Sequence, residues 1–148
     1  MAQQEILDLL ERDFPAVIVD ERAAPHECLE CDEISRAVAD RAWREVPREF
    51  VADNCDVLPL LSQKAYGAYL AAWLAEGVRE PDQGVASMVL INLANDPPES
   101  DFSDQQAATI IRVAKFIAET SYWGSDDPET QKSLEKIEKV WGRSDTPE

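Results

Sequence analysis

The chain has 148 residues, and 30 acidic against 14 basic residues give it a formal net charge of -16. A chain of this length can bury a hydrophobic core as one domain, without needing metals or disulfides in order to fold. The negative charge argues against direct binding to nucleic acids or anionic membranes, whose phosphates it would repel, and favours a basic protein partner or a cation.

The N-terminus, Met-Ala-Gln-Gln-Glu, lacks the basic region of a signal peptide, and no apolar run reaches membrane-spanning length. Three cysteines without a secretory signal are typical of a reducing compartment. We therefore expect a cytoplasmic protein without a disulfide framework.

The first predicted element is an amphipathic helix over residues 3–13, followed by Pro15. Val17, Ile18 and Val19 form an apolar run that would suit a strand, but no second segment is suited to pair with it. We interpret residues 17–19 as an extended connector.

Residues 20–31 are predicted to be irregular. Asp32 is the expected N-cap of a helix that runs to about Trp43 and is buried through Ile34, Val38 and Ala42. A short helical turn is expected after Pro47, ending near Asn54.

Residues 62–77 predict the central helix, with Ser62 as its N-cap. One face carries large side chains at helical spacing, and the opposite face is nearly all alanine. The large side chains are Tyr66, Tyr69, Leu70, Trp73 and Leu74. A helix that is apolar all round is expected to be buried.

Three helices are predicted after it. One spans residues 83–95, and a second opens with the capping box of Ser103 and Gln106 and runs to about Tyr122. The last starts after the N-cap Asp127 and ends at Gly142, and the tail from 143 to 148 should fray. The sequence thus predicts one all-α domain over residues 1–148, a bundle of six or seven helices.

One pattern has the spacing of metal ligands, His26-x-Cys28-x-x-Cys31. Two thiolates and an imidazole suit tetrahedral zinc, with a fourth ligand from Cys55, Asp32, Glu33 or water. The plainer interpretation is that both cysteines pack as small buried hydrophobes and that His26 hydrogen-bonds locally.

A third interpretation is a dithiol that cycles through a disulfide. A helix N-terminus would lower a thiol pKa, but the four nearby carboxylates would disfavour a thiolate, and no βαβ context precedes the motif. The sequence ranks this redox interpretation last.

Other catalytic patterns, such as a glycine-rich phosphate loop or a Gly-x-Ser-x-Gly elbow, do not occur in the chain. The four tryptophans are expected in the core, and Trp123, beside a glycine turn, is expected to be the most exposed of them.

The segment Pro25-His26-Glu27-Cys28-Leu29-Glu30-Cys31, with the Tyr/Leu-rich stretch from Tyr66 to Leu74, resembles a family of small bacterial domains of unknown function. The resemblance covers about residues 14–122. Where that family often carries Tyr-Leu-Pro in the central helix, this chain has Tyr69-Leu70-Ala71. The resemblance implies a bacterial domain and no particular activity.

Abundant acids and few catalytic groups favour a non-enzymatic interaction module, for example an inhibitor or immunity-type protein for a basic protein partner. The alternative is a small zinc-binding protein or an enzyme that uses His26, Cys28 and Cys31.

Overall fold

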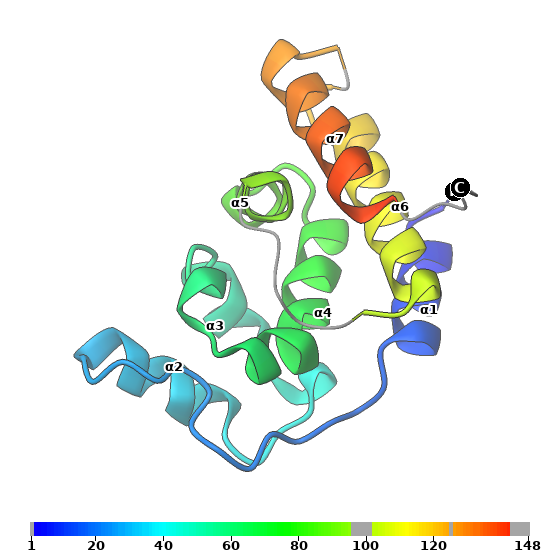
Figure 1. Cartoon of the computed structure of the whole chain (residues 1–148). Coiled ribbons are helices and arrows are strands. Elements are labelled where there is room, and N and C mark those ends of the chain that lie inside the picture. The colour runs from blue at the N-terminus through cyan, green and yellow to red at the C-terminus, as the bar shows by residue number, and fades with distance from the viewer. Residues whose placement is uncertain (1, 96–101, 125, 143–148) are drawn as a thin grey trace.

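The structure, a computed structural model, describes residues 2–95, 102–124 and 126–142, and over these ranges it is helical without any strand. Seven α-helices and two 3-10 turns follow one another: α1 Gln3–Asp13, α2 Leu29–Val38, η1 Trp43–Glu45, α3 Arg48–Asp53, η2 Leu58–Leu60, α4 Gln63–Arg79, α5 Gly84–Asn95, α6 Asp104–Thr120 and α7 Pro128–Trp141. The predicted all-α bundle is confirmed (Figure 1). The tail expected to fray, 143–148, lies outside the described residues.

The helix α4 forms the centre of the bundle and packs against α1, α3, α5, α6 and η1. The hydroxyl of Ser62 caps it by accepting a hydrogen bond from Ala65 N at 3.1 Å, as predicted. Every residue from Tyr69 to Val78 is buried, so the expectation of a helix buried on all sides is confirmed for this part of α4, whereas Gln63 and Lys64 in its first turn are exposed. Gly77 permits close approach of α6, because a Cβ there would lie 3.0 Å from Ile117 Cδ1.

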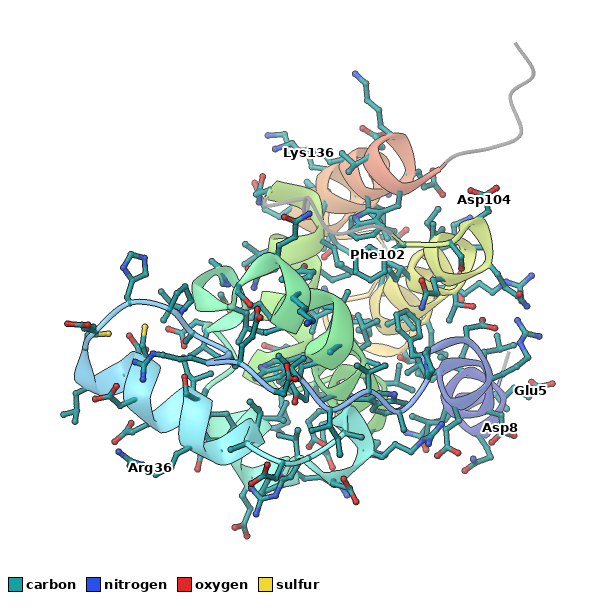
Figure 2. The ribbon with its side chains drawn as sticks, turned by 60° about the horizontal axis from the view of Figure 1, so that its bottom comes forward. Glu5, Asp8, Arg36, Phe102, Asp104 and Lys136 are labelled. Atoms are coloured by element: carbon teal, nitrogen blue, oxygen red, sulfur yellow. The ribbon has the colours of Figure 1, made fainter. Side chains whose placement is uncertain are left out.

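The helices α5, α6 and α7 complete the bundle, with α7 packed against α5 and α6. The predicted capping box is formed, with Gln106 N donating to Ser103 Oγ at 3.0 Å and Ser103 N donating to Gln106 Oε1 at 2.9 Å. Asp127 caps α7 as predicted. Figure 2 shows Phe102 turned inward, where its ring meets that of Trp141 edge-on at 5.4 Å.

Three buried indoles donate their N–H to the backbone near the end of a distant helix. Trp43 reaches Phe14 O after α1 at 2.8 Å, and Trp73 reaches Asn54 O after α3 at 3.2 Å. Trp141 reaches Leu93 O in the last turn of α5 at 3.1 Å. These carbonyls belong to the set that a helix end leaves without an intrahelical partner.

Trp123 is the most exposed of the four tryptophans, as predicted. Its side chain is half-buried, whereas Trp43, Trp73 and Trp141 belong to the core.

The predicted bounds of the second helix are wrong at both ends. The helix starts at Leu29, four residues early, because Cys28 rather than Asp32 is its N-cap. It ends at Val38 because Asp40 adopts a left-handed backbone with φ of 60°, which reverses the chain. Trp43 therefore lies in η1 and not in this helix.

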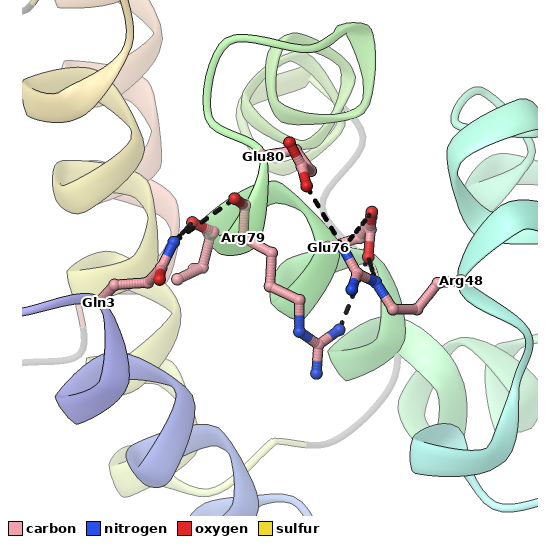
Figure 3. Close-up of polar contacts among 6 residues, drawn as sticks. Gln3, Arg48, Glu76, Arg79 and Glu80 are labelled. Carbon is pink, nitrogen blue, oxygen red and sulfur yellow. Dashed lines mark hydrogen bonds and ion pairs between the residues drawn. The ribbon is translucent and has the colours of Figure 1, made fainter.

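Glu76 carries a buried charge, with its side chain 5% exposed. Its carboxylate accepts two hydrogen bonds from Arg48, from Nε to Oε1 at 2.7 Å and from Nη2 to Oε2 at 3.2 Å. Arg79 approaches Oε1 at 3.6 Å, and Arg48 also reaches Glu80 at 3.4 Å (Figure 3). This network joins α3 to the C-terminal end of α4.

None of the helices described here is both long and apolar enough to cross a membrane.

Candidate functional site

A groove of about 420 Å³ lies between residues 19–23 and α2. In Figure 1, α2 projects from the lower left of the bundle, and Figure 2 shows Arg36 on this helix. Four carboxylates and two guanidinium groups line the groove: Asp20, Glu21, Arg22, Asp32, Arg36 and Asp40. The groove therefore carries a negative balance of charge between two walls of different backbone structure.

Tyr69 of the central helix holds both walls in place. Its hydroxyl accepts a hydrogen bond from Val19 N at 3.4 Å and lies 2.8 Å from Arg41 O, to which it donates. Val19 itself is buried and so anchors the extended segment against the bundle. The sequence places Tyr69 in the core, and the structure adds that its hydroxyl joins the loop to the end of α2.

Arg22 organises the loop that leads into α2. Its Nε donates to Ala24 O at 2.6 Å, and its Nη2 donates to His26 O at 2.8 Å and to Asp32 Oδ1 at 2.6 Å. Ser35 of α2 adds a hydrogen bond to the same loop, its hydroxyl accepting from Ala24 N at 3.2 Å. The irregular segment predicted from the sequence is thus fixed by side chains rather than by regular structure.

The charges in the groove are unequally compensated. Arg22 and Asp32 neutralise each other, and Glu21 lies 3.9 Å from Lys64. Within the described ranges, Asp20, Asp40 and the cation Arg36 form no side-chain hydrogen bond or ion pair, which leaves two unpaired carboxylates and one unpaired guanidinium group. Both carboxylates are exposed and available to a cationic ligand.

The structure places the three predicted zinc ligands around the start of α2 but does not assemble them into a metal site. His26 and Cys28 are exposed, and Cys31 is buried. Over the residues that can be described, no three His, Cys, Asp or Glu side chains are grouped so as to hold a metal ion. The zinc site stays a prediction, and the described residues provide no third ligand grouped with the two cysteines.

Two of the three residues do come together. Cys28 is the N-cap of α2, and its Sγ accepts a hydrogen bond from Cys31 N at 3.3 Å. A hydrogen bond with the Cys28 side chain, and then burial, raise the pKa of the Cys31 thiol. Cys55, the third thiol, is half-buried in the segment that follows α3, and its pKa is raised by burial and by Asp56.

The groove itself was not predicted from the sequence. Its walls are an extended segment and a helix whose bounds were predicted wrongly, and the tie between them is a tyrosine hydroxyl from α4. A signal was nevertheless present, because the apolar run of residues 17–19 had no partner strand and is followed at once by Asp20 and Glu21.

No protein-family model, no curated protein and no solved structure matches this chain.

Proposed function

We propose that the protein is an acidic, non-enzymatic interaction module that binds a basic segment of a protein partner in the groove beside α2. The observation that carries the proposal is the pair of uncompensated carboxylates, Asp20 and Asp40, on opposite walls of one groove. A Lys or Arg side chain entering the groove could reach both walls and replace the solvent around these groups.

Apolar surface lies next to these carboxylates. The side chains of Val17 and Ile18 are 40% and 55% exposed, directly before the wall that contains Asp20. Their backbone lies outside any helix, and an extended peptide could lie along it as an added strand. The favoured ligand is therefore an extended segment in which basic and apolar residues alternate.

One form of this function is an inhibitor or immunity-type protein that covers the basic site of a toxin or nuclease. The net charge of -16 would speed the approach of such a partner through long-range attraction. The proposal places the encounter in the cytoplasm, where the three free cysteines would stay reduced.

The test uses a synthetic peptide of alternating Lys and Val, titrated into the ¹⁵N-labelled full chain. We expect shift changes at residues 17–23 and 32–40. The double variant Asp20→Asn/Asp40→Asn should bind about fivefold more weakly, since exposed charge pairs contribute about 0.5 kcal/mol each. Asparagine tolerates the left-handed backbone of position 40, so this variant should keep the loop geometry.

The matched control is Glu119→Gln/Glu135→Gln, which removes the same charge from exposed positions on α6 and α7. This control should bind within about twofold of the wild type, because charges beyond a Debye length are screened. Equal weakening of both double variants, or shifts spread over the whole surface, would show that attraction is general and that the groove is not the site.

A further inference from the structure

The cysteine pair at the start of α2 is asymmetric. Cys28 is exposed and Cys31, one helical turn later, is fully buried. Cys28 has an extended backbone, with φ of -151° and ψ of 165°, which turns its sulfur back over the first turn of the helix. One residue of the pair is therefore open to a reagent from solvent, and the other is shielded from it.

The backbone of α2 fixes the position of the exposed sulfur. Cys28 Sγ accepts the N–H of Cys31, one of the N-terminal amides that a helix leaves without an internal partner.

The carboxylates that weighed against this chemistry in the sequence are partly compensated. Asp32 is held by Arg22 at 2.6 Å. Glu27, Glu30 and Glu33 are exposed, so water screens their charge at the sulfurs. The carboxylates therefore place less uncompensated charge beside the sulfurs than the sequence suggests.

We propose that Cys28 and Cys31 form a redox-active dithiol that reduces disulfides by thiol–disulfide exchange. The exposed Cys28 thiolate attacks one sulfur of the substrate disulfide, which breaks the S–S bond and releases one thiol. Cys31 then loses its proton and attacks Cys28 Sγ, releasing the second thiol and leaving a Cys28–Cys31 disulfide. The two thiols of the protein are oxidised by two electrons, the substrate disulfide is reduced, and the two protons leave on the released thiols.

This activity is independent of the basic partner proposed for the groove. Binding there depends on Asp20 and Asp40, whereas exchange depends on two sulfurs at the other end of α2.

The test treats the full-length reduced protein with oxidised glutathione and follows the products by mass spectrometry. The wild type should become lighter by two hydrogens, with the bond inside tryptic peptide 23–36, which contains Cys28 and Cys31. Cys55 lies in tryptic peptide 49–64 and serves as the internal control, and Cys55→Ser should behave as the wild type.

Two single variants test the order of attack. Cys31→Ala should accumulate a mixed disulfide with glutathione at Cys28, because the resolving thiol is missing. Cys28→Ser, which supplies a favoured N-cap residue and keeps the helix start, should form a mixed disulfide at Cys31 at least about tenfold more slowly, since access limits exchange. Circular dichroism of each variant checks that the fold is kept.

The proposal is overturned if the wild type takes up glutathione without closing the Cys28–Cys31 bond, or if both single variants react equally fast. It is also overturned if protein purified without a histidine tag carries stoichiometric zinc that is lost in Cys28→Ser and in Cys31→Ala. That last result would instead support the zinc site predicted from the sequence.

Discussion

Asp13 joins the end of α1 to α6 through its side chain and its backbone. Its carboxylate accepts a hydrogen bond from the Thr109 hydroxyl and one from Arg12 Nε at 2.6 Å, and its carbonyl accepts one from Gln106 at 3.0 Å. Burial acts to raise the pKa of Asp13, but the hydrogen bonds from Arg12 and Thr109, with the charges of Arg12 and Arg112, together hold it below the usual value.

This lowered pKa predicts a loss of stability in acid. The ionised Asp13 stabilises the fold above the unfolded-state pKa of about 3.9, and this contribution is lost as the pH falls through the lower folded-state pKa. In urea unfolding at pH 7 and pH 3, Asp13→Asn should therefore lose less stability between the two pH values than the wild type. The exposed Glu119→Gln should keep the wild-type difference, and an unchanged pH dependence in Asp13→Asn would contradict the assignment.

Single residues also set the limits of prediction from the sequence. Cysteine is not a preferred N-cap, so Asp32, which has a better capping side chain, was the natural choice for the start of α2. In the structure Cys28 is the N-cap instead, with an extended backbone and a side chain that accepts a hydrogen bond from Cys31 N. The cysteine pair itself was recognisable from its spacing. Which of the two sulfurs is exposed depends on how the segment packs against the bundle, and the spacing gives no information on that packing.

The link between α3 and α4 rests on the buried carboxylate of Glu76. Its side chain is 5% exposed, while that of its partner Arg48 is 55% exposed. Removing the arginine leaves a buried charge with weakened compensation, whereas removing both charges leaves an apolar site that can repack.

We therefore expect Arg48→Ala to lower the free energy of unfolding by about 2 kcal/mol, the order of a hydrogen-bonded charge pair. Adding Glu76→Leu to that variant should recover part of the loss. Urea unfolding of the single and double variants measures both effects. A double variant less stable than Arg48→Ala alone would mean that Glu76 stabilises the fold without the arginine.

Elements with strong local signals were predicted well. The caps Ser62, Ser103 and Asp127 and the periodic apolar residues that follow them fixed the starts of α4, α6 and α7. The end of α2 depends instead on the left-handed conformation of Asp40. Only a minority of aspartates adopt this conformation, so the residue type alone does not predict it. The groove was not predicted for the same reason, because both of its walls lie in segments whose structure has no strong local sequence signal.

The net charge acts on the molecule as a whole. With -16 at neutral pH, the compact state concentrates like charges that the unfolded chain holds farther apart. Added salt shortens the Debye length to about 10 Å at 0.1 M and so relieves this repulsion.

The midpoint of urea unfolding should therefore rise as sodium chloride is increased from about 0.01 M to about 0.3 M, because screening favours the more compact state. Sucrose at matched osmolality is the control for effects unrelated to charge. Binding of the Lys/Val peptide should weaken over the same range of salt. A midpoint that falls with salt would indicate that specific ion pairs outweigh the overall repulsion.

The three indole hydrogen bonds affect how the molecule comes apart. The ends of α1, α3 and α5 are each bonded to an indole from a segment remote in sequence, so these helix ends are incomplete until the tertiary structure exists. When one of these helix ends frays, the tryptophan bonded to it loses its partner and becomes exposed. When that tryptophan instead loses its packing first, the helix end loses its hydrogen bond and loosens. Local melting is thereby converted into a cooperative event, in which helical content and the burial of the indoles disappear in a single transition.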